Sequence, residues 1–169
     1  DTTEREVLTV AGMPTVKMGK TNQAPLNRSG DDLRIEWGYL YLTAPKGEVR
    51  EFVCEQDKMA YIMGTVPVSP MGDSLILLAY DDCRASIQYF GETLASVWNR
   101  NGETIETAIE NAYIEYGPLL DKCAAFSAKL YCDAVKAGGV QYAEMLSLAY
   151  RQAISAHKCV VDTEGQVLF

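Results

Sequence analysis

The stretch GGVQYAEMLSLAYRQAISAHK, residues 138–158, carries the strongest fold signal in the chain. Its apolar and polar residues recur with the spacing of an amphipathic helix, so we predict a helix over residues 140–158. Gly138 and Gly139 stand directly before it and form a stop signal for any preceding helix. Little sequence follows the helix for its apolar face to pack against. We therefore expect the chain to be a piece of a larger protein.

Two further helical segments precede the glycine pair. Apolar residues from Ile105 to Cys123 keep a period of 3.6, and acidic side chains fill the first turns, where the helix dipole favours them. Because Pro118 cannot donate a backbone hydrogen bond, the first helix should end or kink near Tyr116. A second helix should then run over about residues 118–136. The pattern thus predicts three helices.

The first half of the chain carries strand signals. In LRIEWGYLYLT, residues 33–43, apolar residues alternate with Arg34 and Glu36, as in a half-buried strand. The turn signal APKGE and the segment EVREFVCE follow. They predict an antiparallel hairpin over residues 33–54.

Other segments extend this β portion. The continuous apolar run SLILLAY, residues 74–80, predicts a strand buried on both faces, and RASIQYF, residues 84–90, alternates again. Residues 12–32 are rich in turn formers, which predicts a long surface loop with one short strand at most. CVVDTEGQVLF, residues 159–169, predicts two short strands around a DTEG turn.

These signals define an α+β chain that forms one structural unit. An antiparallel β portion, sheet or sandwich, is predicted over residues 1–97, and a helical portion over residues 98–169.

Composition excludes several classes of function. The 169 residues carry a net charge of -8, without a cluster of Lys or Arg, so nucleic acid and anionic membrane surfaces are not expected partners. No apolar run of about 20 residues predicts a membrane span. The five cysteines have no metal-ligand spacing and are predicted to be small buried apolar residues. Since nucleotide and zinc motifs are also missing, we expect no cofactor and no metal.

Several blocks resemble one known family. WGYLYLTAP, LLAYDD, SIQYFGETL, LLDKCAAFSAKLYCDAVKAGG and YAEMLSLAYRQAISAHK occur in this order and cover nearly the whole chain. They are similar to the central domain of glutaminase A-like proteins of fungi and Bacteroides-type bacteria. In that family the segment follows an N-terminal β-domain and leads into a C-terminal toroid of six helical hairpins.

The resemblance implies a fold context and a function. It makes the helix at 140–158 the first helix of a truncated toroid, and it makes the remaining domains of the same polypeptide the partners of this chain. It implies a periplasmic or extracellular hydrolase that releases ammonia from glutamine, on an architecture shared with six-hairpin glycosidases. The chain alone is expected to be inactive, with a linking role and a contribution to the rim of the active site. Apolar surface left by the missing domains would favour a homo-oligomer of the fragment.

Asp81 and Asp82 are the candidate catalytic residues. They end the apolar run at 74–80, and two neighbouring carboxylates can raise each other's pKa and supply an acid and a base for hydrolysis. Successive strand residues point to opposite faces, however, so the pair shares a site only if the backbone turns there. The alternative interpretation is a turn and cap role.

The candidate substrate-binding residues are Trp37, Tyr80, Arg151 and His157. Trp37, with Tyr39 and Tyr41, forms either a platform for sugar stacking or part of the core. Arg151 binds a substrate carboxylate or joins an ion pair with groups near Glu144. His157 is the one histidine of the sequence, so any catalytic triad would depend on it; the alternative is a packed residue at the end of a helix.

Two other classes of function remain open at this stage. Cys83 and Cys159 are conceivable thioester nucleophiles, although no neighbouring base is evident in the sequence. The chain could also belong to a glycosidase acting on glycans, or serve as a carbohydrate-binding module.

Overall fold

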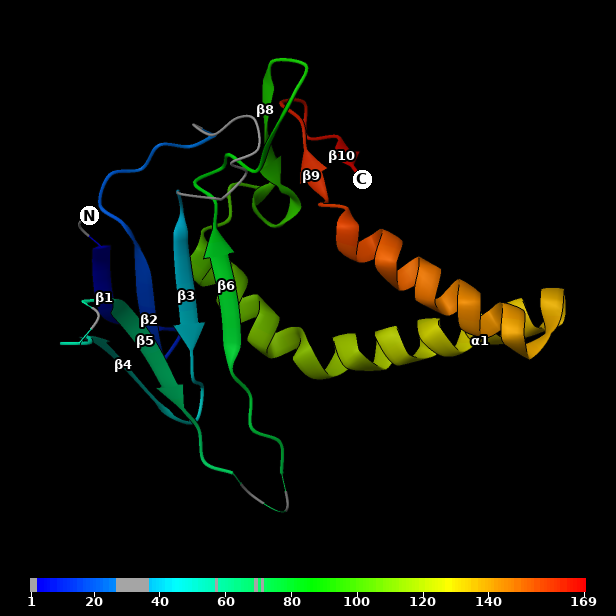
Figure 1. The fold of residues 1–169 in the computed structure, drawn as a ribbon, viewed down its shortest axis with the longest axis horizontal. Helices are drawn as coiled ribbons and strands as arrows, with labels where there is room; N and C mark the ends of the chain where they lie inside the picture. The colour runs from blue at the N-terminus through cyan, green and yellow to red at the C-terminus, as the bar shows by residue number, and fades with distance from the viewer. Residues whose placement is uncertain (1–2, 27–36, 57, 69, 71) are drawn as a thin grey trace.

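A computed structural model describes residues 3–26, 37–56, 58–68, 70 and 72–169. Within these residues, one long helix and ten strands in antiparallel sheets make up the fold. The strands form a platform at one end of the molecule, and the helix projects from it as a long hairpin (Figure 1).

The main sheet has the strand order β1-β2-β3-β6. Its strands are β1 (Thr3–Val10), β2 (Met13–Lys20), β3 (Tyr39–Thr43) and β6 (Leu77–Asp81). Ala11 and Gly12 both have positive φ, as the tight turn between β1 and β2 requires. The prediction of a loop over residues 12–32 is therefore wrong for β2, which is an inner strand with paired neighbours on both sides.

The predicted hairpin over residues 33–54 is also wrong. Residues 33–36 lie outside the described part of the chain, and β3 pairs with β2 and β6 rather than with the segment that follows it. That segment, β4 (Glu48–Val53), pairs instead with β5 (Ala60–Thr65). This two-stranded ribbon packs against the main sheet, where Arg5 of β1 forms an ion pair with Glu51 of β4 at 2.9 Å.

Strand β6 is not buried on both faces, contrary to the prediction for residues 74–80. As the edge strand of the sheet, it directs Leu77 and Ala79 toward the core under the helix, whereas Leu78 is 68% exposed on the other face. A continuous apolar run can thus form a strand that is covered on one face only.

A second small sheet joins the two ends of the long helix that follows η1 in the chain. Its order is β10-β9-β8-β7, formed by β7 (Ile87–Tyr89), β8 (Glu92–Ser96), β9 (Val160–Val161) and β10 (Val167–Leu168). The predicted pair of short strands around DTEG is confirmed, because β9 pairs with β10 and the Asp162 Oδ1 atom accepts bonds from the backbone N–H groups of Glu164 and Gln166.

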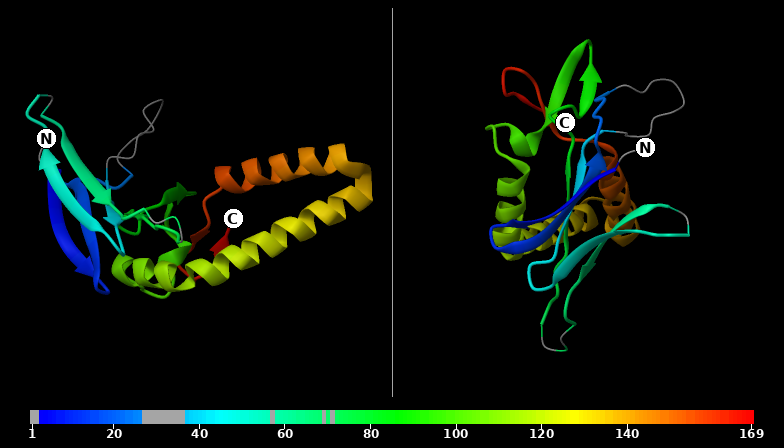
Figure 2. Two further views of the ribbon diagram at one scale, coloured as in Figure 1. Left: turned by 90° about the horizontal axis from the view of Figure 1, so that it is seen from below. Right: turned by 90° about the vertical axis from the view of Figure 1, so that its left-hand side faces the viewer.

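The prediction of three helices leading into a toroid is wrong. After the short 3-10 helix η1 (Val97–Asn99), the single helix α1 runs from Ile105 to Ala156 and contains Pro118 without interruption. Proline removes only one backbone donor, and the bonds of the turns on either side persist. Inside α1 the dihedral angles are non-helical at Gly139, where φ is 83°. There the chain reverses, so α1 consists of a first arm (residues 105–138) and a second arm (residues 140–156) that run side by side (Figure 2).

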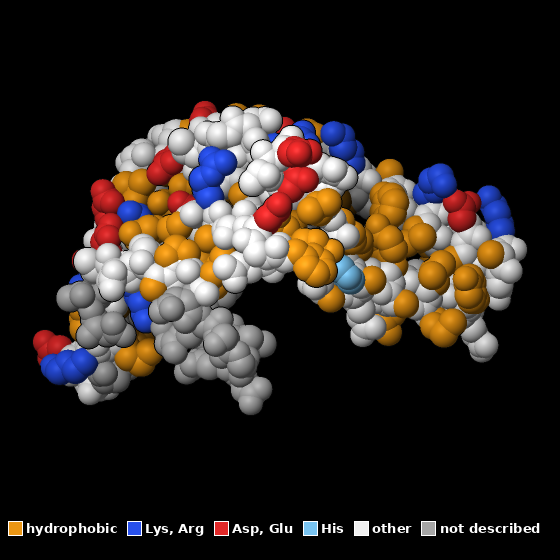
Figure 3. Space-filling view, turned by 90° about the horizontal axis from the view of Figure 1, so that it is seen from above, with side chains coloured by type: hydrophobic (Ala, Val, Ile, Leu, Met, Phe, Trp, Pro, Cys, Tyr) orange, Lys and Arg blue, Asp and Glu red, His pale blue; other side chains and the backbone are white. Residues whose placement is uncertain are grey.

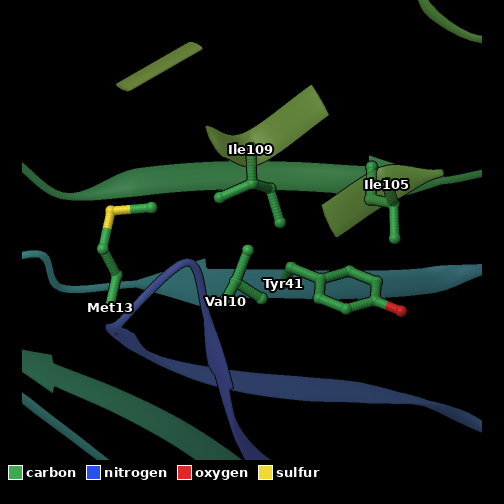
Figure 4. Close-up of a cluster of buried hydrophobic side chains, with 5 residues drawn as sticks. All are labelled: Val10, Met13, Tyr41, Ile105 and Ile109. Carbon is green, nitrogen blue, oxygen red and sulfur yellow. The ribbon is translucent and has the colours of Figure 1, made fainter. Parts of the chain in front are cut away.

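The core lies where the first arm meets the main sheet. Ile105 and Ile109 pack with Val10, Met13 and Tyr41 in a buried cluster (Figure 4). Further along α1, buried side chains are restricted to Ala134 and Ala143, which lie on either side of the reversal. The cysteines are not buried as predicted, because Cys123 and Cys132 are exposed on α1 and Cys54, Cys83 and Cys159 are only partly covered.

The position of Ile109 gives a test of this core. We expect Ile109→Ala to destabilise the protein by about 3 kcal/mol, because it removes buried methyl groups and leaves a cavity. Urea unfolding followed by circular dichroism measures the change. Glu110→Ala is the matched control, since Glu110 is the exposed neighbour on the same helix. Equal effects of the two substitutions would contradict this packing.

Candidate functional site

The backbone reverses sharply directly after β6. Cys83 and Arg84 both have positive φ, 56° and 60°, which is an uncommon conformation for residues other than glycine. The backbone N–H of Cys83 donates to Asp81 Oδ1 at 2.9 Å, and the N–H of Ala85 donates to the carbonyl oxygen of Asp82 at 3.1 Å. These bonds form a turn in which Asp81 and Asp82 have different surroundings.

Asp82 lies at the centre of a buried polar cluster, which we call the Asp82 cluster (Asp82, Ser86, Ser96 and Lys158). The residue is only 2% exposed. Its Oδ2 atom accepts hydrogen bonds from Ser86 Oγ, from Ser96 Oγ at 2.7 Å and from Lys158 Nζ at 3.0 Å. The two serine hydroxyls are also 2.7 Å apart. The cluster therefore joins the end of β6, the β7–β8 hairpin and the segment that leaves α1.

The surroundings of Asp82 favour its charged form. Burial by itself raises the pKa of this carboxyl. The hydrogen bonds from Ser86, Ser96 and Lys158, together with the charge of Lys158, lower the pKa by more than burial raises it. The pKa of Asp82 therefore lies below its ordinary value. Asp82 Oδ1 is buried and has no hydrogen-bond partner among the described residues. An Asp82 that lost the Lys158 charge would be a poorly compensated buried anion.

Trp37 and Gly38 hold the other side of the turn. Trp37 Nε1 donates to the carbonyl oxygen of Ala85 at 3.1 Å, and the Tyr80 hydroxyl donates to the carbonyl oxygen of Trp37. Gly38 has a φ of 87°, and a Cβ atom at this position would overlap the carbonyl oxygen of Asp81. Trp37 is 8% exposed, and Tyr41 is buried as well, so neither ring offers an open face to a sugar.

The two candidate catalytic carboxylates do not face each other in one acid–base pair. Asp81 accepts a backbone bond within the turn, and Asp82 is paired with a lysine and two serines. Cys83 is a poor nucleophile here, because burial and the charges of Asp81 and Asp82 raise the pKa of its thiol. The chemistry of this arrangement is that of a fixed ion pair that ties segments together.

The other two predicted site residues lie on the second arm of α1 and directly after it. Arg151 is exposed on the second arm, where it lines a groove between the two arms of α1. His157 follows the last helical residue, with Nδ1 2.6 Å from the carbonyl oxygen of Ala153 and its ring 5.3 Å from that of Phe169. The structure thus brings together Trp37, Tyr80, Asp81 and Asp82, and it separates them from Arg151.

Ser86, Ser96 and Lys158 were not among the site residues predicted from the sequence. Nothing in the local sequence links them, since Lys158 and Asp82 are 76 positions apart. One general signal was available: an aspartate next to a strongly apolar strand needs a cation if the fold buries it.

Comparisons with known proteins add no relative. No family model, no curated protein and no solved structure matches the chain. Within the described residues, no three His, Cys, Asp or Glu side chains group as a metal site. In the same part of the chain, no helix combines the length and the apolar character needed to cross a membrane.

The Asp82 cluster predicts a large effect of a lysine substitution. We expect Lys158→Met to lower the free energy of unfolding by about 2 kcal/mol, since it leaves a buried carboxylate with two hydroxyl donors only. Lys129→Met is the matched control, because Lys129 also pairs with an aspartate, Asp133 at 2.7 Å, but on the exposed surface of the first arm. Urea denaturation should separate the two variants clearly. If both shift the midpoint equally, the cluster does not stabilise the fold.

The same cluster predicts a pH dependence. The pKa of Asp82 is lower in the folded than in the unfolded protein, so its contribution is fully present above the unfolded value of about 3.9 and is lost as pH falls through the folded value. We therefore expect the stability difference between the wild type and Asp82→Asn to be constant from about pH 7 to pH 5 and to shrink below about pH 4. Urea midpoints across this range measure it. A difference that already shrinks between pH 7 and pH 5 would contradict the assignment.

Proposed function

We propose that the chain is a non-catalytic linking domain of a larger secreted hydrolase of the glutaminase A-like type. In this proposal the β platform fixes the base of the α1 hairpin, and the hairpin docks onto another domain of the same polypeptide. The family assignment is supported by the ordered blocks from WGYLYLTAP to YAEMLSLAYRQAISAHK. The same resemblance supports a periplasmic or extracellular location.

One observation carries the docking role: the first arm exposes several large apolar side chains. This first-arm surface consists of Tyr113, Ile114, Tyr116, Leu119 and Leu120. Ile114 is 65% exposed and Leu119 is 53% exposed. A surface of several large apolar side chains on one helix is typical of a site that another folded unit covers.

The described part of the chain anchors the hairpin to the platform mainly near its base. The most extensive contacts of α1 with other elements are those with β6, β1 and η1, and the buried residues Ile105 and Ile109 lie in the first turns of the helix. Beyond them the arms extend away from the sheets, and apolar side chains gather along the hairpin (Figure 3). A hairpin that projects in this way is accessible for contact with another domain.

A groove lies between the platform and part of the first-arm surface. It has a volume of about 390 Å³ and is lined from the platform by Pro45, Lys46, Asp73 and Leu75, and from the helix by Tyr113, Tyr116, Gly117, Leu120 and Asp121. Apolar and aromatic walls with a few charged groups at the rim are the usual anatomy of an interface between domains.

The Asp82 cluster supports a structural role rather than a catalytic one. Its buried carboxylate is neutralised by Lys158 and saturated at Oδ2 by two hydroxyl donors. A general base needs an accessible carboxylate within reach of a substrate proton. Asp82 instead holds the end of the helical portion against the sheets.

Ammonia release from glutamine tests the proposal. We expect the isolated chain to release none and the larger polypeptide that contains it to be active. In that larger polypeptide, Ile114→Glu should lower the free energy of unfolding by about 2 kcal/mol, because it places a charge where an apolar side chain is buried between domains.

The matched control is Glu115→Gln, which changes an exposed residue next to Ile114. Oligosaccharides are assayed beside glutamine, so that a parent of the glycosidase type is recognised by its products. Activity of the isolated chain would overturn the linking role. An unchanged stability of the Ile114→Glu polypeptide would overturn the docking surface.

A further inference from the structure

The second arm of α1 carries a flank that is complementary to itself. We define the second-arm flank as Glu144, Leu148 and Arg151, which are separated by four and three residues and therefore lie along one line of the helix. Leu148 is 59% exposed. No ion pair joins Glu144 or Arg151 to another described residue. The flank thus offers an acid, an apolar residue and a base in sequence.

A groove of about 510 Å³ runs beside this flank, between the two arms. Phe126, Leu130 and Tyr131 of the first arm line its other side. The rings of Phe126 and Tyr150 lie 5.5 Å apart and join the arms next to it. The groove therefore has apolar walls, and charged groups of the second arm lie along one side.

The charged residues of the first arm near the reversal pair with one another and not with Glu144 or Arg151. Lys129 pairs with Asp133 at 2.7 Å, and Lys136 lies 3.7 Å from the same carboxylate. Glu144 and Arg151 are left to select what enters the groove. Their separation of seven residues corresponds to about 10.5 Å along the helix.

We infer that the second-arm flank is the interface with a second copy of this chain. Two second arms that pack antiparallel around a two-fold axis between Ser147 and Leu148 place Glu144 opposite the partner's Arg151. The same rotation places Arg151 opposite the partner's Glu144, and it brings Leu148 next to the partner's Leu148. One symmetry operation satisfies both charges, as an isologous interface requires.

Charge complementarity is the reason for choosing a second copy. A helix from another protein would need its own base and acid at the same spacing in the opposite order, whereas this chain supplies them itself. The inference goes beyond the proposed function and does not depend on the parent enzyme. It leaves the first-arm surface open for a neighbouring domain.

Charge reversal tests the interface by analytical ultracentrifugation of the chain from about 1 to 100 μM. We expect the wild type to dimerise. Glu144→Arg alone and Arg151→Glu alone should each raise the dissociation constant by at least about tenfold, because each creates two like-charge contacts. The double variant Glu144→Arg/Arg151→Glu should dimerise like the wild type.

An equimolar mixture of the two single variants is the most specific measurement. One copy then carries two bases, and the other copy carries two acids. A heterodimer should therefore form more tightly than either variant dimerises alone. Glu115→Arg is the matched control, since it makes the same charge change on an exposed position of the first arm and should leave the dissociation constant unchanged.

Three results would overturn the inference: a monomeric wild type, an equal effect of the Glu115→Arg control, or a mixture that does not associate. A monomeric wild type would leave a helix of another domain as the occupant of the groove. It would not affect the first-arm surface, whose test is the stability of the larger polypeptide. The two proposals can therefore fail separately.

Discussion

The buried carboxylate of Asp82 is the constraint on which the arrangement of this protein depends. A charged group that is removed from water must be paired, and here the pairing groups come from two segments that are far apart in the chain. Ser86 and Ser96 belong to the β7–β8 hairpin, and Lys158 follows α1. The requirement to neutralise one side chain thus joins the end of β6 to the point where the chain leaves α1. The pairing of β8 with β9 acts in the same place, where Ser96 lies opposite Val160.

This attachment explains how a long hairpin is held by a small platform. The first arm is fixed by apolar packing of Ile105 and Ile109, and the end of the second arm is fixed by an ion pair and a short strand pairing. Between these two attachments, the arms support each other through contacts such as that of Phe126 with Tyr150. Their other faces are rich in exposed apolar residues, which is a cost in water unless another surface covers them. These exposed residues are the basis of the two proposed interfaces.

The strained turn after β6 has a structural explanation. Cys83 and Arg84 adopt the left-handed conformation, which is unfavourable for side chains of this kind. The conformation directs Asp82 into its cluster and lets the Asp81 side chain bond the backbone of Cys83. Trp37 and Gly38, directly before β3, pack against this turn. Asp81 and Asp82, the predicted catalytic pair, therefore have different partners because of this turn.

The local features of the fold could be predicted from short stretches of sequence. The helical period of the second arm, the reversal at Gly139 and the DTEG turn depend on neighbouring residues, and each is visible in a short stretch. Only the tertiary structure decided which strands pair, because β3 finds its partners in β2 and β6 rather than in the next segment along the chain. Pro118 did not end the helix, since the loss of one backbone bond is small beside the bonds and contacts of the whole arm. The candidate site also combines a local feature with contacts between distant segments. Asp82 was found from its position after a strand, but its partners Ser86, Ser96 and Lys158 were not, because their proximity arises only when segments far apart in the chain fold together.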